Sequence, residues 1–206
     1  MNARGLAALT LSLFLCSPLS AEYLYKDEVI HLEDVTQAVE VIGKELHEKT
    51  GVGLYVAVLK ELEQNLTIVD YEKRLMDELE QPAVLLVISE YDKQIDIFAR
   101  PASLYKDFDK AQVLSPFPNS GTILPILTMK SKKATVSEKF GAAVENGYAD
   151  IAEQIADSRD VTLEHGFGNA NKTVFNILRL IFYGIIAYAL FLYIKRKFYT
   201  KRNHES

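Results

Sequence analysis

The stretch "AVLLVISEYDKQIDIFARP", residues 83–101, has the clearest pattern in the chain. An uninterrupted apolar run ends at Ser89, and a short polar segment follows it. Apolar and polar side chains then alternate up to Pro101. A continuous apolar run indicates a strand buried on both faces, and alternation indicates a strand with one exposed face. The stretch therefore predicts a strand, a tight turn at Tyr91–Lys93 and a second, antiparallel strand.

A helix is predicted well upstream of this hairpin, over residues 33–50. Asp34 and Gln37 are the expected N-terminal capping pair, and Gly51 is the expected C-terminal stop. Apolar side chains recur at the helical spacing that buries one face, at Val35, Val39, Ile42 and Leu46. These features together predict a helix packed against a sheet.

A strand and a second helix connect this helix to the hairpin. Residues 52–60 are a mostly apolar run and predict a buried strand. The next helix begins with a cap at Asn65 or Thr67 and ends before Pro82, with an apolar stripe at Ile68, Tyr71, Leu75 and Leu79. A strand, helix and strand in succession normally form a parallel pair with a right-handed crossover.

The segment after the hairpin ends in a long helix. Residues 103–114 predict a short helix and residues 115–121 a loop, whereas residues 122–130 are apolar but contain a proline. They fit either a short helix or an edge strand. Thr135 and Glu138 have the spacing of a capping box, and a long apolar stripe follows at Val136, Phe140, Val144, Tyr148, Ile151 and Ile155.

These elements predict an α/β fold in a single domain, residues 22–165. We expect a three-layer α/β/α sandwich around a mixed, mostly parallel sheet of about four strands. The segment after Asp160 is rich in glycine and asparagine, and residues 166–173 are the expected linker to the rest of the chain. One transmembrane helix is expected to follow the linker.

The first 21 residues have the layout of a secretory signal peptide. A single charge, Arg4, precedes an apolar run from Leu6 to Leu15, and a small residue stands at Ala21. We predict cleavage after Ala21; the alternative is an uncleaved anchor helix, although the run is short for a membrane span. The only cysteine, Cys16, lies within this segment, so cleavage after Ala21 would leave a mature protein with no disulfide and no thiol chemistry.

A second apolar segment predicts one membrane-spanning helix, residues 174–194. Residues 177–194 are nearly all apolar and about as long as a bilayer requires. Arg179 lies near the outer end of the span, where it either reaches the headgroups or pairs with an acid on a partner's membrane helix. Residues 195–206 form a basic tail, and such charge marks the cytoplasmic side of a span: Lys195, Arg196, Lys197, Lys201 and Arg202.

Both ends of the chain therefore predict the same topology. The domain is exported, one helix crosses the bilayer and the tail stays in the cytoplasm. The short signal and the lack of disulfides indicate a bacterial envelope protein. With the predicted span, this gives a single-pass protein of the inner, or cytoplasmic, membrane with its domain in the periplasm. The lipid bilayer is accordingly one predicted partner.

The segment predicted to be exported is strongly acidic, and this charge limits the classes of partner that it can bind. Residues 22–172 carry 16 Lys and Arg and 27 Asp and Glu, a net charge of −11. Such a body repels phosphate backbones, so nucleic acid is not an expected partner. It attracts cations and basic protein surfaces instead.

Acidic clusters are the only candidates for chemistry. The chain has no nucleophile elbow, no phosphate-binding glycine motif and no metal-ligand spacing among its four histidines. Glu90 and Asp92 lie at the predicted hairpin turn, and Asp107 and Asp109 follow its second strand. Carboxylates from two loops suit a calcium ion, which takes six to eight oxygen ligands. Charge at turns is also ordinary, so a plain hairpin bend is the alternative.

The order of elements, together with four segments, resembles the TPM domain family. The matching segments are "EKTGVGLYVAVLK" (48–60), "VDYEKRLMDEL" (69–79), "AVLLVISEYDKQIDIFA" (83–99) and "EKFGAAVENGYADIAEQI" (138–155). The resemblance covers residues 28–158. A glycine-rich segment usual in the family after the third strand is replaced here by "RPASLYKDFDKAQ".

The resemblance implies two functions. The family includes a photosystem II repair protein and an acetylcholine-receptor modulator, which implies a membrane-anchored accessory domain that helps to assemble or maintain envelope membrane proteins. It also includes a thylakoid phosphatase-like protein, which implies a metal-dependent phosphatase as the alternative. Asp92 matches the family's turn acid, and Asp109 is the best match to its later aspartate.

Overall fold

The chain forms an α/β fold on one four-stranded sheet. The computed structural model of the protein describes residues 22–131, 133–166, 180–186, 188 and 191. The predicted signal peptide, most of the predicted linker, and the topology signals at Arg179 and in the basic tail lie outside these residues. Among the residues that are described, no helix is long and apolar enough to cross a membrane.

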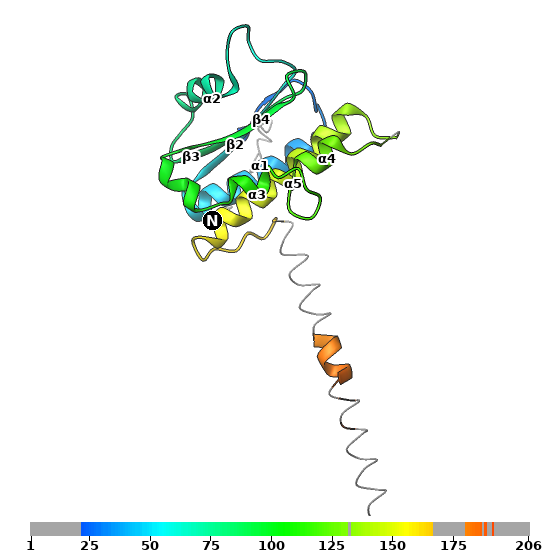
Figure 1. The fold of residues 1–206 in the computed structure, drawn as a ribbon. Coiled ribbons are helices and arrows are strands. Elements are labelled where there is room, and N and C mark those ends of the chain that lie inside the picture. The colour runs from blue at the N-terminus through cyan, green and yellow to red at the C-terminus, as the bar shows by residue number, and fades with distance from the viewer. Residues whose placement is uncertain (1–21, 132, 167–179, 187, 189–190, 192–206) are drawn as a thin grey trace, which may run out of the picture.

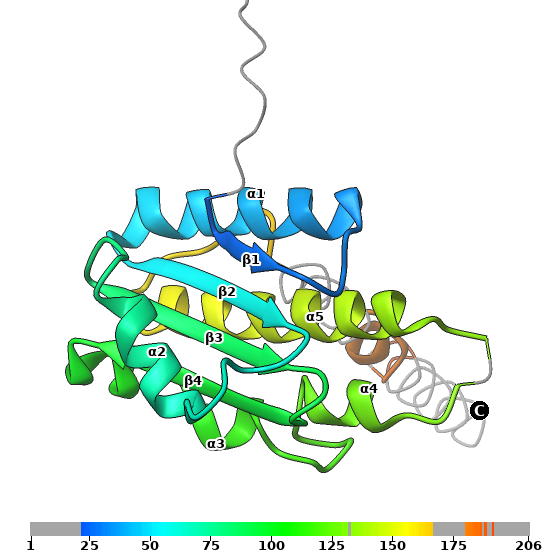
Figure 2. The same ribbon diagram turned by 90° about the horizontal axis from the view of Figure 1, so that it is seen from above.

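The sheet has the strand order β1-β2-β3-β4, so neighbours in sequence are neighbours in space (Figure 2). The strands are β1 (Leu24–Asp27), β2 (Gly53–Leu59), β3 (Ala83–Ser89) and β4 (Gln94–Arg100). β1, β2 and β3 are parallel, and β4 is antiparallel to β3. The parallel pair and the hairpin predicted from residues 83–101 are both confirmed. β2 and β3 are buried along their whole length, as their continuous apolar runs predict.

β1 is a strand that the sequence pattern did not reveal. It has only four residues, and its pairing with β2 is interrupted by an irregularity between Leu24 and Lys26. A strand this short shows too few alternating positions for a period of two to be recognised. It completes the sheet on the side next to α1 (Figure 2).

Helices flank both faces of the sheet (Figure 1). One face is covered by α2, which packs on β3 and β4, and the other by α1 and α5, which pack on each other and on β2. The helical elements are α1 (Glu33–Thr50), α2 (Ile68–Met76), the 3-10 helix η1 (Ala102–Lys106), α3 (Lys110–Val113), α4 (Leu124–Thr128) and α5 (Val136–Asp157).

The ends of α1 and α2 agree with the sequence in part. Gly51 ends α1 with a positive φ of 71°, a conformation that glycine adopts without strain. The predicted bounds of α1 are confirmed, but the predicted capping pair Asp34–Gln37 is wrong, because Asp34 lies within the first turn and the N-cap is Leu32, which makes no side-chain hydrogen bond. Of the two predicted caps for α2, Thr67 is confirmed: its side chain accepts a hydrogen bond from the amide of Asp70.

The region after β4 is helical wherever it is regular. The short helix predicted over residues 103–114 divides into η1 and α3, and residues 122–130 form the helix α4 rather than an edge strand. Pro125 stands within the first turn of α4, where its missing N–H leaves no intrahelical bond unmade. The predicted capping box of α5 is confirmed, with Thr135 and Glu138 bonded reciprocally.

Candidate functional site

The carboxyl ends of the three parallel strands meet at one edge of the sheet, where open α/β folds bind their ligands. Asp27 ends β1 and Glu28 follows it, Lys60 follows β2, and Glu90 follows β3. The turn of the β3–β4 hairpin lies at the same edge, because β4 starts there and runs back along β3. This edge therefore gathers charged residues from three connections.

Two acids at this edge hold the backbone of the connections. The carboxylate of Asp27 accepts hydrogen bonds from the amides of Val29, Ile30 and His31 at 3.1, 2.7 and 2.6 Å. Glu28 accepts the amide of Lys60 at 3.0 Å and pairs with the ammonium of Lys26 at 3.0 Å. Partial burial alone would raise the pKa of Glu28, but these donors outweigh it and lower the pKa.

Asp92 has a similar role in the hairpin turn. Its Oδ2 accepts the amide of Leu62 at 2.8 Å and the hydroxyl of Ser89 at 2.5 Å. The hydrogen bond from Ser89, followed by that from Leu62, lowers the pKa of Asp92. One carboxylate thus ties the hairpin to the connection that follows β2. The turn predicted from the sequence is present, and its acid stabilises it.

An apolar cavity lies beside this turn. It has a volume of about 400 Å³, in the range of small ligand pockets. The hairpin, α4 and α5 contribute its apolar walls, with Glu90 and Lys93 at its charged part; the apolar lining is Ile88, Ile95, Leu124, Leu127 and Phe140. No residue of α4 is fully buried, but Ile126 and Leu127 are half-buried and pack against the core, so this helix forms one wall of the cavity.

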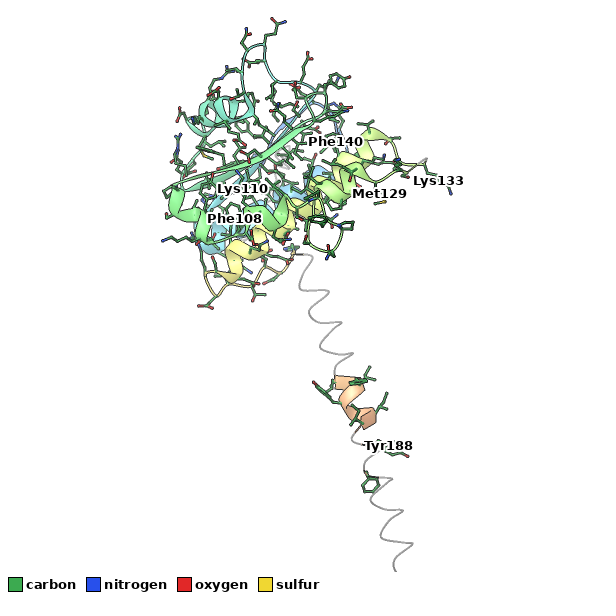
Figure 3. The ribbon with its side chains drawn as sticks, in the orientation of Figure 1. Phe108, Lys110, Met129, Lys133, Phe140 and Tyr188 are labelled. Atoms are coloured by element: carbon green, nitrogen blue, oxygen red, sulfur yellow. The ribbon has the colours of Figure 1, made fainter. Side chains whose placement is uncertain are left out.

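The second predicted pair of acids lies at the other end of the sheet. Asp107 follows η1 and forms an ion pair with Arg159 at 2.9 Å. Asp109 is the N-cap of α3, and its Oδ1 accepts the amide of Gln112 at 3.0 Å. In Figure 3, Phe108 and Lys110 mark this end of the domain, while Phe140 lies at the opposite end, beside the cavity.

The structure therefore does not bring Asp92 and Asp109 together. Asp92 precedes β4 and Asp109 follows it, and a strand of seven residues spans roughly 20 Å. Two ligands of one calcium ion each lie within about 2.6 Å of it, so this arrangement does not support a shared site. Within the described residues, no group of three or more His, Cys, Asp or Glu side chains is placed to hold a metal ion.

A wide hollow of about 640 Å³ surrounds Asp107 and Asp109. It is lined by residues 105–111 together with Gln154, Asp157 and Ser158. The acids predicted from the sequence are engaged here in ion pairing and helix capping, as described above. The hollow is larger than the cavity at the hairpin, but it lies at the amino end of β3 and away from the edge where parallel strands present their ligands.

Sequence reasoning missed the most perturbed acid, Glu72 in α2. Its side chain is fully buried, and its two carboxyl oxygens accept no hydrogen bond from the described residues. Burial, followed by the neighbouring charge of Asp96, raises its pKa to about 8, although Lys110 opposes the shift. Glu72 lies four residues from both Ile68 and Met76, so it falls on the apolar stripe of α2. This spacing could have predicted that its side chain is buried.

Comparison with known proteins does not assign the chain to a family. No protein-family model matches the chain, and no curated protein matches it significantly. The resemblance to the TPM domain family stays a prediction from the sequence.

Proposed function

We propose that this chain is a membrane-anchored, extracytoplasmic accessory domain that binds a segment of another envelope membrane protein and supports its assembly or maintenance. The observation that carries the proposal is the apolar cavity between α4 and the β3–β4 hairpin. The resemblance to the TPM domain family supports it independently. The partner class and the inner-membrane location follow from the predicted signal peptide and the predicted span.

The chemistry of the cavity suits a protein segment. Leu124, Leu127 and Phe140 offer apolar contacts, and a cavity of about 400 Å³ accommodates a few apolar side chains. Glu90 and Lys93 supply one charge of each sign beside them, which orients a polar backbone or a charged flank of the bound segment. The residues of α4 are at most half-buried, so this helix is held by fewer buried side chains than the core helices α1 and α5.

The alternative predicted from the sequence, a metal-dependent phosphatase, finds less support. It requires carboxylates on one cation that polarises a phosphate or activates a water molecule. Asp92 and Asp109 are separated by the length of β4, and each is bonded to backbone amides. Glu90 and Asp107 are likewise at opposite ends of that strand.

The proposal is tested by photo-crosslinking in living cells. A photoreactive phenylalanine analogue replaces Leu127 in the cavity of the full-length protein, and in a matched control it replaces Val69. Val69 is an apolar, 40 % exposed residue of α2, on the other face of the sheet. We expect irradiation to attach an integral membrane protein to position 127 and not to position 69. Adding the charged substitution Phe140→Glu should abolish the adduct.

Two results would count against the function. Equal adducts from positions 127 and 69 would mean that the cavity is not the binding site. Adducts of position 127 that contain no membrane protein would remove the accessory role, even if a soluble protein were bound there.

A further inference from the structure

Glu40 in α1 is a buried acid with an unusual set of hydrogen-bond donors. Its side chain points to the start of the described chain, and only 7 % of the residue is exposed. Its Oε1 accepts three backbone N–H groups, from Glu22 at 2.9 Å, Tyr23 at 2.8 Å and Leu24 at 2.9 Å. One carboxylate oxygen therefore gathers three consecutive nitrogens.

A charged partner for Glu40 is missing from the side chains. No Lys, Arg or His within the described ranges forms an ion pair with it, although the partly buried acids Glu28 and Glu45 both have one. A buried carboxylate is normally paired with a cation, because removing an isolated charge from water is costly. The three nitrogens are thus the groups from which a counter-charge can come.

The first of these nitrogens belongs to the residue after the predicted signal cleavage site. The sequence predicts cleavage between Ala21 and Glu22, from the small residue that follows the apolar run. The nitrogen bonded to Glu40 is that of Glu22, and β1 begins two residues later. The predicted cleavage site and the hydrogen bond to Glu40 are independent observations, and both involve the nitrogen of Glu22.

We propose that Glu22 is the N-terminal residue of the mature protein and that Glu40 is the binding site for its α-ammonium group. A signal peptidase hydrolyses the Ala21–Glu22 bond; water supplies the hydroxyl to the carbonyl carbon of Ala21 and one proton to the nitrogen of Glu22, and the new carboxylic acid of Ala21 releases a second proton that the amine takes up at neutral pH. The neutral amide then becomes an ammonium group. Its hydrogen bond to Glu40 becomes a charge-assisted ion pair, which is about twice as strong as a neutral bond.

This site links export to folding. In the precursor, Glu40 receives only neutral N–H donors, whereas in the cleaved chain it receives a positive charge. Processing therefore strengthens the attachment of β1 to α1 and fixes the edge of the sheet. The inference concerns maturation, so it does not depend on which partner the cavity binds.

The test uses the full-length protein, expressed with its own signal and purified from membranes in mild detergent. Mass spectrometry of the N-terminal peptide is expected to show Glu22 as the first residue. The rate at which an acetylating reagent modifies its α-amino group is then compared with that of Glu40→Gln. We expect the wild-type amine to react about tenfold more slowly, which corresponds to about 1.4 kcal/mol of protection.

Two further variants keep the outcome clear. Glu48→Gln changes an exposed acid two turns along the same helix and should leave the rate at its wild-type value. An alanine inserted between Glu22 and Tyr23 leaves the predicted cleavage site unchanged, puts a neutral amide beside Glu40 and moves the ammonium group one residue away, and this amine should react as fast as that of Glu40→Gln. The insertion gives the answer even if Glu40→Gln does not fold.

Two results would overturn the proposal. One is a mature chain that begins at any residue other than Glu22, including an uncleaved precursor. The other is an α-amine that reacts equally fast in the wild type and in the insertion variant.

Discussion

Glu72 is the residue whose environment conflicts most with its chemistry. It lies under α2 with no exposed surface, next to Asp96, whose charge is paired with Lys110. A proton on Glu72 resolves the conflict, since the neutral carboxyl group can donate a hydrogen bond to the carboxylate of Asp96. The shift of its pKa from 4.5 to about 8 expresses this preference.

The raised pKa makes the stability of the fold depend on pH. The folded state keeps a proton that the unfolded state releases, so the contribution of Glu72 is fully present below pH 4.5 and is lost as the pH rises toward 8. We expect Glu72→Gln, which keeps a donor but cannot ionise, to remove this loss. The loss amounts to at most about 1.4 kcal/mol per pH unit.

Denaturant unfolding of the purified protein at a series of pH values measures this effect. Glu80→Gln is the control, because Glu80 is an exposed acid just beyond the end of α2. A Glu72→Gln variant with the same pH profile as the wild type would mean that Glu72 is ionised in the folded protein.

At the scale of elements, Gly43 lies where α1 closely approaches α5 and the start of β1. Gly43 faces the rings of Tyr23 and Tyr148, and a β-carbon at position 43 would lie 2.5 Å from a ring carbon of Tyr23. Tyr148 is fully buried and donates a hydrogen bond of 2.6 Å to the carbonyl oxygen of Leu54 in β2. The glycine thus lets α1 lie directly on a tyrosine whose position the sheet fixes.

Gly43→Ala is therefore expected to destabilise the protein, although alanine is the better helix former. Overpacking a rigid core typically costs about 1–3 kcal/mol, which exceeds the gain of about 1 kcal/mol from helix propensity. Thermal or denaturant unfolding measures the change. Lys44→Ala, on the exposed side of the same helix, should stay within about 0.5 kcal/mol of the wild type. A Gly43→Ala protein as stable as this control would show that the tyrosines move aside easily.

At the scale of the whole molecule, α1 holds both ends of the domain. Glu40 binds the amides of residues 22–24, and Glu45 binds the amides of Glu164 and His165 at 2.5 and 3.1 Å. Glu45 also contacts Lys49 at 2.7 Å and the ring of His165 at 2.9 Å. The chain thus leaves the domain, toward the predicted span, from a point anchored on α1.

The anchoring by Glu45 has a definite pH dependence. Burial by itself would raise the pKa of Glu45, but Lys49, the amide of Glu164 and His165 lower it to about 2. Its contribution to stability is therefore present above pH 4.5 and is lost as the pH falls toward 2. Glu45→Gln should remove the same contribution at neutral pH and release the segment around His165.

Hydrogen exchange detects this release. The amides of Glu164 and His165 are expected to exchange faster in Glu45→Gln than in the wild type, while those of β2 keep their protection. Glu48→Gln, one turn away and exposed, should exchange as the wild type does. Unchanged protection at Glu164 in Glu45→Gln would show that the segment is held by other contacts.

The sequence predicted where part of the candidate site lies along the chain, but it did not predict how the residues of the site are arranged in space. The hairpin turn and Asp92 were placed correctly, because an apolar run followed by alternation is a local pattern. The distance between Asp92 and Asp109 was not accessible, because it depends on the path of the chain after β4. The cavity could not be predicted either, since the sequence of residues 122–130 fits both a short helix and an edge strand. Only the structure shows that they form α4 and line the cavity together with the hairpin.

The sequence by itself determined the elements whose signals are local. These are the extents of α1 and α5, the parallel pairing of β2 with β3 and the antiparallel return of β4. Periodicity, caps and turn residues act within a few positions, so they can be read without knowing what lies across the core. The tertiary structure alone decided the strand β1 and the environments of Glu40, Glu45 and Glu72. The physical reason is that burial and hydrogen bonding of these groups depend on residues far apart in the chain, which only the folded core brings together.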